Sequence, residues 1–79
     1  SIVDLPKAIA SQSEFVLRRI GEPMQLDVEL LGQLKELGIL PGAKVTVDFE
    51  GTSVLIAKHG SADGLRLETD LAMHLFVEA

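Results

Sequence analysis

The chain has 79 residues, no cysteine and a net charge of −5 at pH 7. Its length allows one small domain, and the lack of cysteine excludes disulfides and thiolate-bound metal sites, which fits a reducing cytosol. The acidic charge argues against DNA binding by this chain alone. The sequence shows no signal peptide and no apolar run near the roughly 20 residues that span a bilayer, which favours a cytoplasmic protein without membrane contact.

Residues 1–13 mix small, polar and apolar side chains. Pro6 stands near the start of this segment, and the run Ser11-Gln12-Ser13 closes it. Such a composition predicts an interdomain linker or tail with at most one helical turn, at residues 7–10. The folded domain is therefore expected at residues 14–79.

The first strand is predicted at Glu14–Ile20, because this segment is rich in aliphatic and aromatic side chains. Arg18 is expected to stay in water, and the side chains that can face inward are Phe15, Leu17 and Ile20. The run Gly21-Glu22-Pro23 follows, and glycine and proline favour a turn. The strand is therefore expected to end there.

An amphipathic helix is predicted at residues 28–37. Asp27 is a good N-cap, and Leu26 is placed to pack against Leu31 across the helix start as a hydrophobic staple. Gly38 suits the left-handed residue that commonly ends a helix. One stripe of the helix is apolar and has to dock on the rest of the domain; it consists of Leu30, Leu31, Leu34 and Leu37.

A hairpin is predicted in the middle of the chain. Lys44–Glu50 alternates apolar and polar side chains, and residues 53–59 are rich in aliphatic and β-branched ones. Gly51-Thr52 supplies the turn between them, so the two strands should pair antiparallel. Residues 60–64 are a loop by composition.

Two further short strands are predicted, at residues 65–68 and at Leu75–Glu78, with a helical turn through Met73 between them that Thr69 or Asp70 caps. About five short strands and one long helix leave too few crossovers for a parallel sheet. The predicted fold class is mainly β: a small, partly open SH3-like antiparallel barrel, with one helix after the first strand and a short helical turn before the last.

The candidate functional group is Glu22-Pro23-Met24-Gln25, which places a carboxylate and an amide oxygen three residues apart where the first strand leads into the helix. Both are hard oxygen donors that suit Mn²⁺ or Fe²⁺ in combination with imidazoles from elsewhere. Two oxygens do not hold a metal alone. A polar loop near a helix N-terminus explains the same spacing, and the residues alone leave that alternative open.

No enzyme is expected. His59 and His74 lie far apart in sequence, without a partner at metal-ligand spacing, so a solvated or turn-capping role suffices for each. Ser61 and Asp63 near His59 supply the residue types of a catalytic triad. They share one short loop, however, without an oxyanion element.

With Glu-x-x-Gln after a strand, a capped helix, the run Leu34-Lys35-Glu36-Leu37-Gly38-Ile39-Leu40-Pro41-Gly42 and a hairpin in this order, the chain resembles the FeoA-like, SH3-like domain family over residues 14–78. Within that family it is most similar to the C-terminal domain of the iron- or manganese-dependent repressors, the diphtheria toxin repressor and iron-dependent regulator group. The segments that carry this likeness are Glu22-Pro23-Met24-Gln25, Lys58-His59-Gly60 and Asp70-Leu71-Ala72.

The resemblance implies a C-terminal regulatory domain attached to a winged-helix DNA-binding domain and a dimerisation domain, with operator DNA bound only through the former. In those repressors the SH3-like domain lends a glutamate and a glutamine to an ancillary Fe²⁺ or Mn²⁺ site, whose other ligands come from the dimerisation domain. Carried over to this sequence, the two ligands are Glu22 and Gln25. The isolated domain is expected to be monomeric, because the dimer contact belongs to another domain.

Two other functions stay open at this level. A free-standing FeoA-like protein that assists a ferrous-iron membrane transporter has nearly this length. The ligand-like Glu22 and Gln25, the acidic charge and the linker-like residues 1–13 argue against it. A structural interaction module without a metal is the third reading, in which Val54 and Ile56 on an edge strand meet a partner.

Overall fold

The computed structural model describes residues 2–5 and 14–78. Its elements are β1 (Ile2–Asp4), β2 (Glu14–Ile20), α2 (Glu22–Gln25), α3 (Val28–Glu36), β3 (Lys44–Glu50), β4 (Ser53–Lys58), β5 (Gly64–Glu68), α4 (Thr69–Ala72) and β6 (Leu75–Glu78). Within these residues the six strands form one antiparallel sheet in the order β1-β6-β2-β3-β4-β5.

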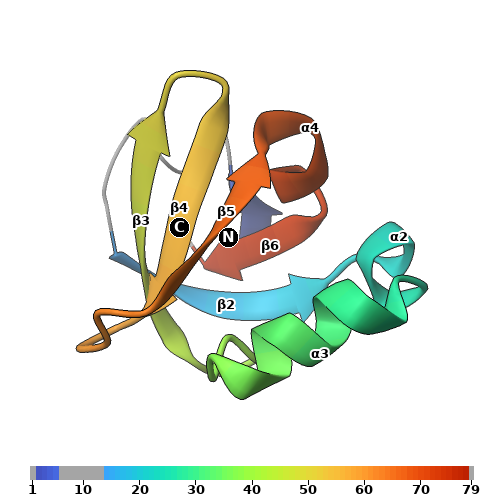
Figure 1. The fold of residues 1–79 in the computed structure, drawn as a ribbon, viewed down its shortest axis with the longest axis horizontal. Coiled ribbons are helices and arrows are strands. Elements are labelled where there is room, and N and C mark those ends of the chain that lie inside the picture. The colour runs from blue at the N-terminus through green and yellow to red at the C-terminus, as the bar shows by residue number, and fades with distance from the viewer. Residues whose placement is uncertain (1, 6–13, 79) are drawn as a thin grey trace.

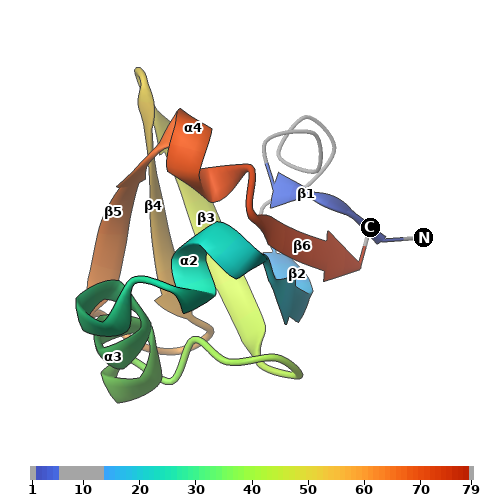
Figure 2. The same cartoon turned by 90° about the vertical axis from the view of Figure 1, so that its right-hand side faces the viewer.

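The sheet bends strongly. β3, β4 and β5 stand across the direction of β2 and β6, with α3 at one open end of the curved sheet and α4 at the other (Figures 1 and 2). The two ends of the strand order, β1 and β5, do not pair with each other. The predicted fold class is confirmed: the protein is mainly β, and its sheet is a small antiparallel barrel that stays open.

The core lies inside this curve. From the sheet it takes the inward-facing residues of β2 to β6, and α3 adds Leu30 and Leu34, which are 8% and 0% exposed. The strands alternate as predicted: Leu75 and Val77 are fully buried, and Phe76 between them is only partly so. A small domain gains most of its stability from such burial.

A β-bulge interrupts the pairing of β2 with β6. Leu17 is opposite Val77 and Arg19 is opposite Phe76, so Arg18 is the extra residue. The bulge shifts the alternation by one position. Both arginines therefore face outward, and Ile20 returns to the core at 4% exposure.

Several predicted elements are confirmed. β2, the β3–β4 hairpin and β6 lie where the sequence patterns place them. α3 begins at Val28, and its N-cap Asp27 accepts a hydrogen bond from the Leu30 N–H at 3.0 Å. Gly38 has the left-handed φ of 74° expected after the helix.

Several details differ from the sequence prediction. Ile2–Asp4, within the segment predicted as a linker, forms β1 on β6, whereas the predicted turn at residues 7–10 lies outside the described residues. Leu26 is 74% exposed, so it gains little from a staple.

The N-cap of α4 is Glu68, because the hydroxyl of Thr69 donates instead to Thr52 O at 2.7 Å. Val54 and Ile56 are fully buried on the interior strand β4, which removes the proposed apolar edge.

Among the described residues, no helix has the length and apolar character needed to cross a membrane.

Candidate functional site

The predicted ligand pair lies on α2, a short helix that the sequence analysis treated as a loop. Gly21 is its N-cap, and Pro23 lies in the first turn. Backbone N–H groups there have no partner within the helix, so the N–H that proline lacks costs no hydrogen bond. Met24 is fully buried and anchors the helix to the core. Because residues at i and i+3 share a helix face, Glu22 and Gln25 lie on the same side of α2.

The side-chain amide of Gln25 is held in one orientation. Its Nε2 donates a hydrogen bond to the carbonyl oxygen of Ile20, the last residue of β2, at 2.5 Å. Since only the amide nitrogen can donate, the carbonyl oxygen Oε1 is the end directed away from this contact. A ligand whose other end is fixed by a hydrogen bond in this way is preorganised for a metal.

The Glu22 side chain is exposed, and it makes no hydrogen bond or ion pair within residues 2–5 and 14–78. It stands in the first turn of α2, next to the N-cap. Its carboxylate is therefore available to a ligand from outside this chain.

The start of α2 is braced by the turn before β6. The Gly21 N–H donates to the carbonyl oxygen of His74 at 2.6 Å. A Cβ built on Gly21 would lie 2.9 Å from that oxygen, so this position accepts only glycine without a shift of backbone. No local pattern indicates this contact, because the two residues are far apart along the chain.

Of the remaining sequence candidates, His74 lies beside the start of α2 through its backbone, whereas the others lie elsewhere. His59 Nδ1 lies 3.2 Å from Glu14 Oε1, at the other end of β2. Ser61 Oγ accepts from the Asp63 N–H at 3.1 Å, as in an ordinary turn. Within the described part of the chain, no three His, Cys, Asp or Glu residues form a metal-binding group. Glu22 and Gln25 thus make at most part of a site.

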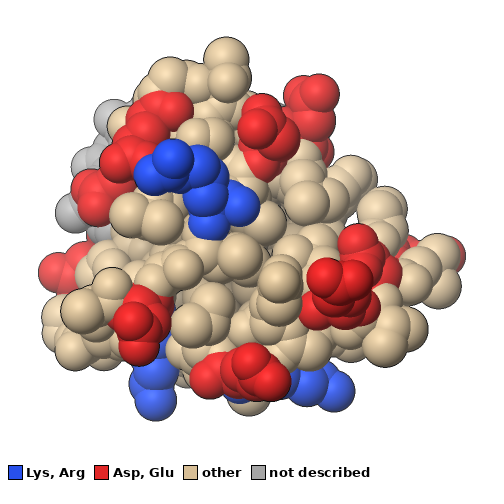
Figure 3. Space-filling view, viewed as in Figure 1, with Lys and Arg blue, Asp and Glu red and all other residues tan. Residues whose placement is uncertain are grey.

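The charged surface is divided. The face in Figure 3 carries separate acidic patches, with basic side chains in one upper cluster and along the lower margin. Some of the basic side chains form ion pairs: Arg66 with Glu50 at 2.6 Å, and, on other strands, Arg18 with Glu78 at 3.3 Å. This face offers no continuous basic surface for a phosphate backbone.

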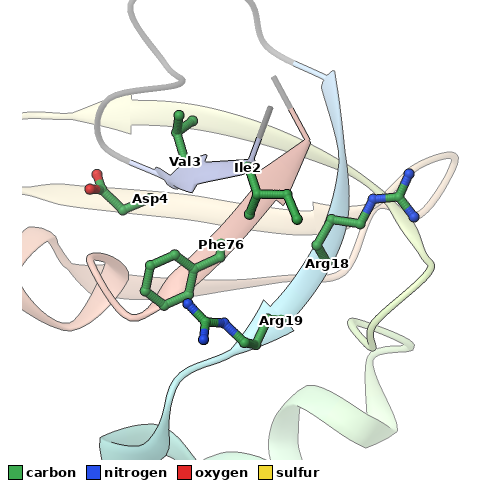
Figure 4. A pocket seen from close by; sticks show the side chains of 6 residues that line it. All are labelled: Ile2, Val3, Asp4, Arg18, Arg19 and Phe76. Carbon is green, nitrogen blue, oxygen red and sulfur yellow. The ribbon is translucent and has the colours of Figure 1, made fainter.

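A groove of about 620 Å³ lies on the outer side of β1, β2 and β6. Arg19 stacks on Phe76 there, with its Cζ 4.2 Å from the ring centroid, whereas Arg18 points away from the ring (Figure 4). Ile2, at 56% exposure, lies on the same side. The stacked guanidinium holds Arg19 across the seam between β2 and β6.

Comparison with models of known protein families finds none that matches this chain, and comparison with curated proteins finds no matching relative.

Proposed function

We propose that this chain is the C-terminal regulatory domain of a transcriptional repressor that depends on Fe²⁺ or Mn²⁺, as its resemblance to the diphtheria toxin repressor group implies. In this proposal Glu22 and Gln25 contribute two ligands to an ancillary metal site. The other ligands come from a dimerisation domain, and a winged-helix domain binds the operator.

The observation that carries the proposal is the fixed amide of Gln25. Its Nε2 is engaged by Ile20 O, so Oε1 is presented on the face of α2 that also carries Glu22. A carboxylate and an amide oxygen suit hard divalent cations such as Mn²⁺ and Fe²⁺. The donor set therefore fits the metal, although it is incomplete without ligands from another domain.

The metal would supply a link between this domain and the dimerisation domain. Glu22 brings the negative charge, while Gln25 brings an oriented neutral oxygen. Because a metal shared by two domains favours the arrangement in which both sets of ligands meet, its binding stabilises that arrangement by linkage. The acidic chain contributes to repression through the dimer and leaves DNA contact to the other domains.

The test is the double variant Glu22→Ala with Gln25→Ala in the full product of the gene. Loss of two ligands should weaken Mn²⁺ binding to the ancillary site by about 10- to 100-fold or more, since even outer partners of metal ligands have effects of that size. Isothermal titration measures the affinity, and a gel-shift titration with metal measures operator binding. Unchanged metal affinity and unchanged operator binding would overturn the proposal.

A matched control is Glu29→Ala with Gln33→Ala. These residues also provide an exposed carboxylate and an exposed amide, but they stand on α3, outside the proposed ligand pair. Metal affinity should stay at the wild-type value in this variant. Equal losses in both double variants would indicate a general charge effect and contradict a specific role for Glu22 and Gln25.

One observation favours a second candidate, the FeoA-like accessory protein of a ferrous-iron transporter. Ile2–Asp4 pairs with β6, and Leu5 is fully buried, so this part of the N-terminal segment belongs to the sheet. The argument from the linker-like N-terminus therefore loses weight, while the ligand-like pair and the acidic charge still count against the accessory protein. The reading frame upstream of the codon for Ser1 separates the two: a winged-helix domain and a dimerisation domain with His and Glu ligands support the repressor, and their absence supports the accessory protein.

A further inference from the structure

We propose that the open edge of β5 binds an extended, basic peptide segment of a partner protein, which adds to the sheet as a further strand. The segment carries aliphatic side chains at alternate positions and lysine or arginine near its ends. This interaction goes beyond the proposed metal role and does not depend on it. The binding surface, called the β5 groove, consists of Gly64–Glu68 with Asp27, Glu29, Leu30 and Leu71.

The first support is the unpaired side of β5, which ends the strand order of the described sheet and pairs only with β4. Just beyond β5, the Thr69 N–H donates to Thr52 O at 3.0 Å. Hydrogen-bonded pairs alternate with non-hydrogen-bonded pairs in an antiparallel ladder, so Leu67 and Leu65 also bond to β4. The backbone N–H and C=O of Arg66 therefore point to the open side, where an added strand can bond to both.

The second support is a groove of about 400 Å³ between this open edge and α3. Its apolar lining comes from Leu30 on α3, Leu65 and Leu67 on β5, and Leu71 on α4. Leu65 and Leu71 are only partly buried, although both pack against the core. Successive side chains of a strand point to opposite faces, so every second residue of an added strand would face this lining. The groove therefore suits aliphatic side chains at alternate positions.

The charges around the groove favour a basic segment. Asp27, Glu29 and Glu68 line it, and all three are exposed. Arg66, the cation among the lining residues, is paired with Glu50 at 2.6 Å, which balances its charge. Figure 3 shows acidic side chains over the start of α3 and over the end of β5, with uncharged surface between them. Lysine or arginine at the ends of the segment complements these carboxylates.

A second copy of this chain fits the β5 groove less well. Each chain has a net charge of −5, and pairing two β5 edges would bring the exposed carboxylates of both grooves together. Like charges placed together across an interface disfavour the association, whereas a basic segment gains from the same carboxylates. The observations therefore favour a partner of opposite charge.

The probe is the synthetic peptide acetyl-Lys-Val-Thr-Val-Lys-amide, whose length matches the five residues of β5. Its valines can face the apolar lining, its threonine lies opposite Arg66, and its lysines reach the carboxylates. NMR titration of the isotope-labelled chain locates the contact and measures the dissociation constant. We expect the largest shifts at the amides of β5. The charge-reversed peptide acetyl-Glu-Val-Thr-Val-Glu-amide should bind about tenfold more weakly or worse.

Arg66→Pro and Arg66→Ala separate the backbone contact from the side chain. Both remove the guanidinium, but only proline removes the N–H that points to the open edge, and edge strands tolerate proline in that orientation. Arg66→Ala should bind the basic peptide no more weakly than the wild type does. Arg66→Pro should bind it about tenfold more weakly than Arg66→Ala, because a hydrogen bond is lost.

Glu29→Gln combined with Glu68→Gln tests the charges of the groove and should weaken binding of the basic peptide by about tenfold. Its control is Glu36→Gln with Asp48→Asn, which removes the same charge from two exposed residues outside the β5 groove and should leave binding unchanged. If the amide signals show that Arg66→Pro does not fold, these two double variants decide.

The listed shifts and losses together support the proposal. It is overturned if the basic peptide causes no shifts, if both peptides bind equally, or if the largest shifts lie at β1, the other end of the strand order. Equal binding by folded Arg66→Pro and Arg66→Ala also overturns it, as do equal losses in the two double variants. Shifts at β5 that grow with protein concentration, without peptide, would instead make a second copy the occupant.

Discussion

The peptide N–H of Gly21 and the carbonyl oxygen of His74 are 2.6 Å apart, and this hydrogen bond joins the start of α2 to the turn before β6. It holds the helix that carries Glu22 and Gln25 against the body of the domain. The approach is so close that any side chain at position 21 meets backbone.

Gly21→Ala should therefore destabilise the domain. The added Cβ would lie 2.9 Å from His74 O, and a backbone atom cannot move aside as a flexible side chain does. We expect a loss of about 1–3 kcal/mol in the free energy of unfolding, the usual size of an overpacking effect. Urea unfolding of the chain measures it, and wild-type stability would show that α2 can shift without cost.

Gly32→Ala is the matched substitution with the opposite sign. Gly32 lies inside α3, and a Cβ there has no atom within 4 Å. Alanine in place of glycine in a helix interior should raise the free energy of unfolding by about 0.5–1 kcal/mol. A loss of stability in the same urea experiment would mean that this side of α3 is packed in the isolated chain.

Asp27→Ala should cost about 1 kcal/mol, because it removes the oxygen that accepts from the Leu30 N–H at the start of α3. Asp27→Asn is the control, since asparagine keeps an acceptor at the N-cap and should retain most of the stability. Both are measured by thermal unfolding. If the asparagine variant falls as far as the alanine variant, the charge rather than the hydrogen bond carries the effect.

Leu5→Ala should cost about 2–5 kcal/mol, because Leu5 is fully buried in the core. Leu26→Ala removes the same atoms from a side chain that is 74% exposed, and it should change the stability by less than about 0.5 kcal/mol. Guanidinium unfolding of both variants compares them directly. If both variants lose equally little free energy of unfolding, the N-terminal segment acts as a linker and adds little to the stability of the fold.

Gln25→Glu tests the hydrogen bond on which the proposed metal role depends. At neutral pH a carboxylate has no hydrogen to donate, so two acceptors would face each other at Ile20 O, at a cost of about 1–3 kcal/mol. Glu22→Gln exchanges the same groups in the other direction, and Glu22 has no described partner to lose. Its stability should stay near that of the wild type, and a larger loss in Glu22→Gln than in Gln25→Glu would contradict the assigned contact.

The sequence predicted the elements whose signals are local. The alternation in β3 and the cap at Asp27 reside in a few neighbouring residues, and the structure confirms both. β1 was missed because three residues carry no period and the partner strand is at the other end of the chain. α2 was missed because four residues are too few for a helical stripe, although proline in a first turn is a start signal.

The candidate site also has one part that local sequence predicts and another that depends on contacts between segments distant in the sequence. The spacing of Glu22 and Gln25 can be read along the chain, but the orientation of the Gln25 amide depends on the position of Ile20 O in space. Strict alternation along β2 would also have turned Arg19 inward with Leu17. The bulge at Arg18 turns Arg19 outward instead. The only sign of the bulge in the sequence is that the next apolar residue is Ile20, one position later than strict alternation predicts.

The pairing of Ile2 with Glu78 also has a kinetic consequence. The contact joins residues near opposite ends of the described chain, so the polypeptide must close almost its whole length to form it. Such non-local pairing raises contact order and slows folding. The hairpins formed by β3, β4 and β5 join neighbouring segments, so they can form without closing this long loop, whereas β1 can pair only once β6 is in place.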